Sequence, residues 1–186
     1  PEAALERARL LWLRHRSAEL GVFCPFEGEW DVQQGFNGPW THQGNWQHAI
    51  DFVKQDPTSG KTFKNKGIEL EDYYAFGQGV LSPVEGYVIG LYAKAADNPI
   101  GKVENQKNWG NYIVIRTLSG AIITLAHLKK DSITVAVGEY VFVGKKLGAC
   151  GNSGYSQEPH LHLQAQIGAE LGAFTHPFHL INFYVK

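Results

Sequence analysis

Two closely spaced histidines, His160 and His162, have the spacing to serve a metal-dependent reaction. Polar and apolar residues alternate strictly over 159–167, which predicts a strand. A strand has a side-chain period of two, so one face carries His160, His162, Gln164 and Gln166, and the other carries Leu161, Leu163, Ala165 and Ile167. We expect the leucine face to be core and the histidine face to border water, a cleft or a metal. A polar face exposed to solvent is the simpler alternative.

An acidic residue and a third histidine also stand among apolar neighbours. Asp51 lies between Ile50 and Phe52, and buried acids are rare unless they are paired or bind a metal. A capping or turn aspartate is the alternative. His127 stands near the end of the apolar segment 122–128 without a charged neighbour in sequence, so a core histidine with satisfied hydrogen bonds is the alternative there.

Together, these side chains are the inventory of a catalytic zinc site. Such a site uses three protein ligands drawn from histidine, aspartate and glutamate, and it leaves the fourth position to water. The metal lowers the pKa of that water to roughly 7. One or two further groups are then needed to move protons and to stabilise a tetrahedral oxyanion.

The elements that must position these residues are predicted to be strands. After Gly21, short apolar stretches alternate with clusters of glycine, proline, asparagine and aspartate, which is typical of a series of strands. The predicted strands are 50–53, 79–81, 86–92, 111–116, 121–127, 140–143 and 160–167. The polar stretches 54–71 and 97–108 are predicted to be surface loops. The fold class is therefore all-β, a sandwich or a barrel.

One domain with a short appendage is expected from a length of 186 residues. Apolar residues recur at helical spacing over 3–20, which predicts a short N-terminal helix. We expect residues 1–20 to be a helical leader or linker and residues 21–186 to form the domain. Because the chain begins at Pro1 and contains no methionine, we expect it to be part of a longer product. Membrane anchoring is then expected only through the missing part.

Charge and cysteine content exclude some classes of protein. The formal net charge is -1 and no long basic run is present, which argues against nucleic acid as a partner. Cys24 and Cys150 are the two cysteines, and neither belongs to a CxxC pair. We expect two small buried side chains, with a single disulfide as the alternative. The oligomeric state is not indicated.

The order of the motifs resembles that of the M23 family of zinc metallopeptidases, the lysostaphin and LytM type. The resemblance covers residues 26–184, most of the chain. G-N-S-G at 151–154, followed by P-H-L-H at 159–162 with A-H-L upstream at 126–128, is its most specific part. The other matching segments are His42, A-I-D-F at 49–52, a P-x-x-G-x-V hairpin at 83–88, G-N at 110–111 and a valine-glycine hairpin at 137–144.

The resemblance implies a β-sandwich of antiparallel sheets, of the type with a duplicated hybrid motif, in the domain 21–186. It implies that Asp51 and His162 bind one Zn2+ per chain. It also implies that His127 and His160 act beside the metal, where they deprotonate water, stabilise the oxyanion or protonate the leaving amine. Which of these two histidines has which role stays open.

The first metal ligand departs from the commonest family spacing, which would place a histidine where this chain has Gln47. His48 is nearer to Asp51, but three residues away on an extended strand it would point to the opposite face. We predict His42, because a branch of the family carries its histidine in this earlier place and Gly44 is part of a turn-forming sequence between the two residues. His15, His176 and His179 match no motif and are expected to be surface or packing residues.

The implied activity is that of a zinc endopeptidase acting on peptidoglycan stem or cross-bridge peptides. Such a substrate implies an extracytoplasmic location. The alternative is a weakly active or inactive LytM-like module that binds and regulates a cell-wall hydrolase. A carrier domain of lipoyl or biotinyl type is disfavoured, because the hairpin tip that would need a lysine carries Glu85.

Overall fold

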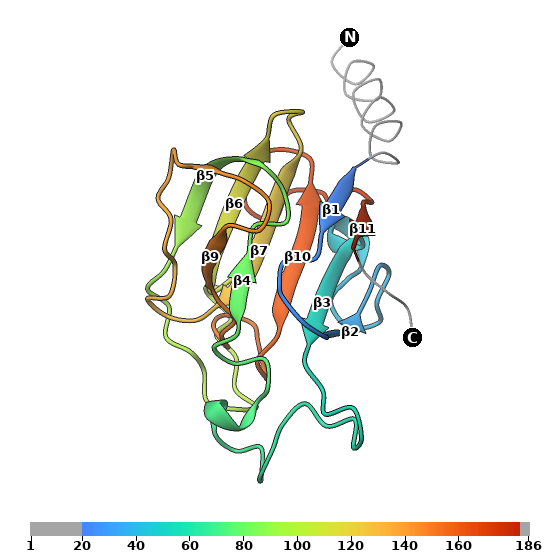
Figure 1. The fold of residues 1–186 in the computed structure, drawn as a ribbon, viewed down its shortest axis with the longest axis vertical. Coiled ribbons are helices and arrows are strands. Elements are labelled where there is room, and N and C mark those ends of the chain that lie inside the picture. The colour runs from blue at the N-terminus through green and yellow to red at the C-terminus, as the bar shows by residue number, and fades with distance from the viewer. Residues whose placement is uncertain (1–19, 183–186) are drawn as a thin grey trace.

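The computed structural model describes residues 20–182, in which strands predominate (Figure 1). The strands are β1 (Gly21–Phe23), β2 (Asp31–Gln34), β3 (Ala49–Val53), β4 (Gly79–Leu81), β5 (Gly86–Tyr92), β6 (Asn111–Thr117), β7 (Ile122–Leu128), β8 (Tyr140–Val141), β9 (Lys146–Ala149), β10 (Leu161–Gln166) and β11 (His179–Ile181). Two short 3-10 helices, η1 (Gly44–Trp46) and η2 (Leu70–Asp72), lie between them. The all-β prediction is confirmed. The helix predicted over 3–20 lies outside the described residues except for Leu20, and the division at residue 20 stays a prediction.

Seven strands form one large antiparallel sheet in the order β2-β3-β10-β7-β6-β5-β8. The small antiparallel pair β4–β9 lies over one face of it (Figure 1). Side chains from both sheets, such as Val80, Leu147, Ile113 and Leu125, belong to one buried core. The described part of the domain is therefore built as the predicted sandwich. An additional pair, β1–β11, is parallel.

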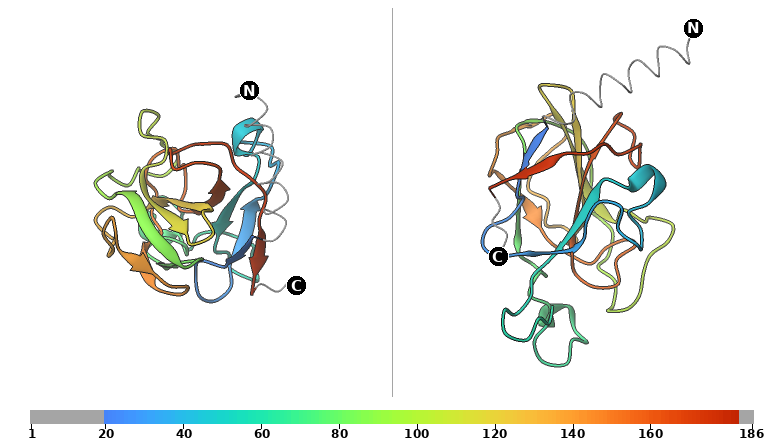
Figure 2. Two further views of the ribbon diagram at one scale, coloured as in Figure 1. Left: turned by 90° about the horizontal axis from the view of Figure 1, so that it is seen from above. Right: turned by 90° about the vertical axis from the view of Figure 1, so that its right-hand side faces the viewer.

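All seven predicted strands are present, with ends that differ by no more than two residues. Four further strands, β1, β2, β9 and β11, are three or four residues long, too short to show a period in sequence. The predicted loop after β3 contains no strand and extends beyond the ends of the sheet (Figure 2). Within residues 20–182, no helix has the length and apolar character needed to cross a membrane.

Strand register brings Asp51 and His162 together. In the pairing of β10 with β3, His162 lies opposite Asp51, and in the pairing with β7 it lies opposite Ala126. Residues directly opposite one another share a face. We call this face of β3, β10 and β7 the site face; the opposite face carries Leu163 and Leu125 into the core.

A β-bulge in β7 brings His127 to the same side. Between β6 and β7, the single residue Tyr112 lies opposite two residues, Ala126 and His127. His127 has φ of 62°, a left-handed conformation that is uncommon for any residue except glycine. Simple alternation would send its side chain to the core with Leu125. The extra residue instead lets it line the same cleft as His162.

Both cysteines are free thiols. Cys150 is fully buried in the core, whereas Cys24 is only partly buried. Burial raises the pKa of the Cys150 thiol, and the charge of Asp97 adds to the shift. The expected pair of buried side chains is therefore confirmed for Cys150 and only in part for Cys24.

Candidate metal centre

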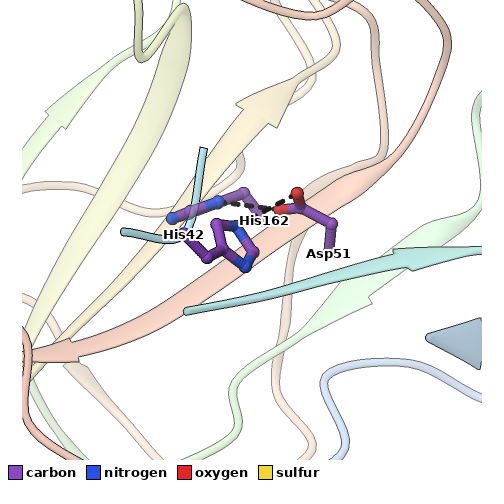
Figure 3. A group of neighbouring side chains, drawn as sticks. All are labelled: His42, Asp51 and His162. Carbon is purple, nitrogen blue, oxygen red and sulfur yellow. Dashed lines mark hydrogen bonds and ion pairs between the residues drawn. The ribbon is translucent and has the colours of Figure 1, made fainter. Parts of the chain in front are cut away.

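Three side chains from distant parts of the chain meet above the site face. His42 comes from the loop that precedes η1, Asp51 from β3 and His162 from β10 (Figure 3). One nitrogen of each histidine and one carboxylate oxygen lie within 4.8 Å of one another, and all three residues are buried. This is the set of residues that the sequence predicts as metal ligands.

The distances in this group are those of atoms that could share a cation. The Nε2 atom of His42 lies 3.1 Å from Oδ2 of Asp51. The Nδ1 atom of His162 lies 2.8 Å from Oδ1 of the same carboxylate. Ligands at about 2.1 Å from a tetrahedral zinc ion are separated by about 3.4 Å. Small adjustments would therefore bring these atoms to ligand spacing.

His42 shows that the group suits a cation. Its Nδ1 donates to the carbonyl oxygen of Gly35 at 3.0 Å, so Nε2 carries a lone pair in the neutral ring. Nε2 lies against the Asp51 carboxylate, yet it is the one buried side-chain nitrogen or oxygen in residues 20–182 without a hydrogen bond of ordinary geometry. A positive charge between this nitrogen and the carboxylate, either a proton or a metal ion, turns the close contact into an attraction.

The charges of the group are strongly coupled. Burial alone would raise the pKa of Asp51, but the neighbouring histidines, above all His162, outweigh it and hold the pKa well below its ordinary value. Burial alone would lower the pKa of His162, but the hydrogen bond to Asp51 and its charge raise it instead. Asp51 is therefore a carboxylate at neutral pH, the form that binds metal.

Gln34 orients Asp51, although it was not among the residues predicted from the sequence. Its Nε2 donates to Oδ2 of Asp51 at 3.0 Å and to the Thr41 hydroxyl, while its Oε1 accepts from the backbone N–H groups of Trp40 and Thr41. A Cβ atom at Gly38 would lie 2.1 Å from the Gln34 side chain, so the loop closes tightly over this amide. A glycine four residues after a glutamine is too weak a signal to find it.

His127 and His160 lie beside the three-residue group. Nδ1 of His127 donates to the carbonyl oxygen of Ser153 at 2.8 Å, and Nδ1 of His160 donates to that of Glu158 at 2.9 Å. Their ring centroids are 4.7 Å apart, and Nε2 of His160 is 3.9 Å from Oδ1 of Asp51. Both rings can therefore offer an Nε2 lone pair in the neutral form.

Two glycine-containing turns build the support of His127. Gly110 has φ of 58°, and a Cβ atom there would lie 2.4 Å from Ser153. A Cβ atom at Gly154 would lie 2.3 Å from the backbone nitrogen of Gly110. The close contact of these turns places the Ser153 carbonyl against His127. Burial and the neighbouring histidines hold the pKa of His127 well below its ordinary value, so it is neutral at physiological pH.

All five predicted site residues line one cleft of about 990 Å³, a volume typical of ligand sites. Five aromatic residues also line it, namely Trp40, Trp46, Tyr73, Trp109 and Tyr155. Its described lining contains two carboxylates, Asp51 and Glu158, and neither lysine nor arginine. A lining with two carboxylates and neither lysine nor arginine favours a ligand that carries little negative charge.

The other histidines lie away from this group. His48 directs Nδ1 to the Thr175 carbonyl oxygen at 3.3 Å and packs edge-on against Phe36. His176 is buried, with Nδ1 bonded to the Pro177 carbonyl oxygen. His179 is exposed at the edge strand β11. His15 is outside the described residues.

The sequence profile of peptidase family M23 matches residues 64–171. The match includes His127, His160 and His162 and begins after His42 and Asp51. A curated relative, an uncharacterised metalloprotease of Buchnera aphidicola subsp. Baizongia pistaciae, is 46% identical over 55 residues. Those residues are 30% of this chain, and the chain spans only 14% of that relative.

Solved structures share the fold. A variant of the catalytic domain of the prophage-encoded M23 protein EnpA from Enterococcus faecalis has a TM-score of 0.55 at 15% identity, over 83% of this chain and 94% of that chain. A protein from Ruminococcus gnavus that has been assigned as a LytM glycyl-glycine endopeptidase has a TM-score of 0.52 at 20% identity, over 86% and 59%. At these identities the structures show the fold alone, and the profile shows the family. The chain belongs to peptidase family M23, a family of metallopeptidases.

Proposed function

We propose that this chain is a zinc endopeptidase that holds one Zn2+ through His42, Asp51 and His162. The observation that carries the proposal is the buried Nε2 of His42, which lacks a hydrogen bond and lies 3.1 Å from a carboxylate oxygen. Two imidazole nitrogens and one carboxylate are a common ligand set for catalytic zinc. Membership of a metallopeptidase family supports the same assignment.

Zinc bound in this site would lower the pKa of a water molecule to about 7 and polarise a peptide carbonyl group. The chain itself supplies the proton transfers. His127 and His160 direct Nδ1 to backbone carbonyls, so each can accept a proton at Nε2. A ring protonated in this way can stabilise negative charge on the carbonyl oxygen and then donate the proton to the leaving amine.

The lowered pKa of His127 keeps that ring neutral and ready to accept a proton at physiological pH. His160 is nearer to the ligand group, since its Nε2 lies 3.9 Å from Asp51. We infer that both rings serve the reaction and that each carries out one of the two proton transfers. Their 4.7 Å separation allows a single reacting group to contact both.

Peptidoglycan stem or cross-bridge peptides are the proposed substrate. The support is family membership together with the similar fold of the Ruminococcus gnavus protein assigned as a glycyl-glycine endopeptidase. The volume of the cleft and its aromatic walls suit a peptide ligand. An extracytoplasmic location is proposed because that is where such peptides are found.

Zinc content of the wild-type chain, His42→Ala and His48→Ala tests the proposal. His48 is the matched control, because it is a histidine of the same segment that contacts Thr175 instead of Asp51. We expect one zinc per chain in the wild type and in His48→Ala, and almost none in His42→Ala, by elemental analysis after dialysis. If zinc is absent from every variant even after the metal is supplied, the chain is a LytM-like regulatory module and not a peptidase.

A further inference from the structure

A row of buried amides runs along the site face from His162 away from the cleft. It consists of Gln164 and Gln166, which alternate with core residues on β10 and are both fully buried. From the alternation in sequence, this whole face is expected to border water, a cleft or a metal. That expectation is wrong for the glutamine half, because the loop 168–175 covers it and supplies its hydrogen-bond partners.

The far end of the row is anchored on backbone carbonyls. The side-chain nitrogen of Gln166 donates to the carbonyl oxygens of Gly168 at 3.0 Å and Glu170 at 2.7 Å. A carbonyl oxygen can only accept a hydrogen bond. These two contacts therefore identify the NH2 end of the Gln166 amide and leave its Oε1 facing the row.

The orientation of the Gln166 amide sets the orientation of the Gln164 amide. Oε1 of Gln166 accepts from the Thr124 hydroxyl at 3.0 Å and from Nε2 of Gln164 at 2.8 Å. Since Gln164 must present its NH2 group to Gln166, its Oε1 points to His162. The distance from that oxygen to Nε2 of His162 is 3.0 Å.

The row therefore ends on a single imidazole nitrogen. An amide oxygen accepts, so the hydrogen of this contact must lie on Nε2 of His162. The opposite ring nitrogen, Nδ1, faces Asp51 at 2.8 Å. The hydrogen-bonding direction is transmitted from two backbone carbonyls through two side chains to the ring.

We propose that Gln164, held by Gln166, is a positioning residue that fixes the hydrogen of His162 on Nε2 and so presents Nδ1 to the metal. The inference rests on the proposed metal centre of His42, Asp51 and His162. It goes further by naming the residues that impose the tautomer of His162. Partners of metal-binding histidines commonly act in this way, and losing one typically costs 10–100-fold in metal affinity.

The test compares the wild-type chain with Gln164→Leu and Gln164→Glu, all labelled with 15N-histidine and loaded with 113Cd. Leucine fills the space without an acceptor, whereas the glutamate carboxyl group can still accept from Nε2 of His162. In the wild type and in Gln164→Glu, we expect cadmium coupling at Nδ1 of His162 and a slowly exchanging hydrogen on Nε2. In Gln164→Leu, we expect rapid exchange of that hydrogen and cadmium affinity lower by about 10–100-fold.

A pair of variants at Gln166 separates its effect on the direction of the hydrogen bonds from its effect on the stability of the loop 168–175. Gln166→Glu keeps an acceptor for Gln164 but loses the donor to Gly168 and Glu170, whereas Gln166→Met loses both. We expect Gln166→Glu to keep the Nε2–H signal of His162 with a lower melting temperature. We expect Gln166→Met to lose that signal as well. This pair also serves if Gln164→Leu does not fold.

The outcomes distinguish the two proposals. If the wild type binds cadmium but couples to it through Nε2 of His162, or if folded Gln164→Leu and Gln166→Met keep the Nε2–H signal and full affinity, the amide row has only a structural role. If the wild type binds neither cadmium nor zinc, the metal centre itself is wrong, and the inference about the row falls with it.

Discussion

The site residues that lie in loops or at strand ends are oriented differently from those inside strands. His42 lies in a loop, His127 at a bulge and His160 just before β10, and each directs Nδ1 to a backbone carbonyl oxygen. Asp51 and His162 lie inside β3 and β10. These two instead contact buried glutamine side chains.

The difference has a simple physical cause. Inside a sheet, the backbone carbonyls of neighbouring strands are already used in the strand ladder, so a side chain there finds partners mainly among the side chains of its own face. Gln34 lies beside Asp51 on the neighbouring strand, and Gln164 lies two residues beyond His162 on the same strand. At loops and bulges the ladder is interrupted, so carbonyls remain free to accept. Substitution can therefore remove the partners of the strand residues but not those of the loop residues.

The largest expected effect separates metal binding from proton transfer. His162→Ala should lose the metal completely. His127→Ala and His160→Ala should keep one zinc per chain and lose turnover by about 10²–10⁴-fold, the usual contribution of acid–base catalysis. Zinc analysis and the hydrolysis rate of a peptidoglycan peptide measure the two effects. Stoichiometric zinc loss in His160→Ala would reverse the assignment of His160 and His162.

An intermediate effect is expected where an amide orients the carboxylate. Gln34→Ala removes the hydrogen bond to Asp51 and leaves the backbone N–H groups of Trp40 and Thr41 without their side-chain acceptor. We expect zinc affinity to fall by about 10–100-fold and stability by about 1–3 kcal/mol, measured by chelator competition and denaturant unfolding. Gln43→Ala is the control, because that exposed glutamine bonds only to the Pro39 carbonyl. Equal effects in both variants would argue that strand and loop residues are not oriented differently.

The smallest expected effect is a pH dependence of the stability of the metal-free protein, which has opposite signs for His162 and His127. The pKa of His162 is raised in the fold, so its contribution to stability is present below the unfolded pKa of about 6.5 and is lost as pH rises through the folded pKa. The pKa of His127 is lowered, so its contribution is present above about 6.5 and is lost as pH falls through the folded pKa.

Unfolding free energies of metal-free wild type, His127→Ala and His162→Ala, measured between about pH 5 and 8, test this. The loss of stability in His162→Ala should shrink as pH rises, and the loss in His127→Ala should shrink as pH falls. Each unit of pKa shift corresponds to about 1.4 kcal/mol. Parallel pH profiles for the two variants would contradict the opposite environments of these rings.

The longer strands were predictable because they are long enough to show a period. The alternation over 159–167 predicted both faces of β10, and the predicted strands 79–81 and 86–92 match β4 and β5 in full. The short strands β1 and β2 were missed, since three or four residues carry no period, whereas the equally short β4 was predicted only from its apolar residues between turn-forming ones. The predicted burial of the leucine face of β10 is confirmed.

The site was predictable as a set of residue types and a family resemblance, but its geometry was not. Gln34, Gln164 and Gln166 carried no signal of a positioning role, because a glutamine is equally common on a solvated face. His127 was expected to end a regular strand. Only the extra residue in β7, with φ of 62° at His127, lets its ring line the cleft.

The sequence by itself determined the all-β class, the polar and apolar faces of β10 and the identity of the residues able to bind a metal. These follow from side-chain period and donor chemistry, which are local properties. Tertiary structure alone decided that Asp51 lies opposite His162, that His42 instead of His48 lies beside that pair, and that a buried amide fixes the hydrogen of His162. Those depend on strand register and loop closure, which bring together residues more than 100 positions apart.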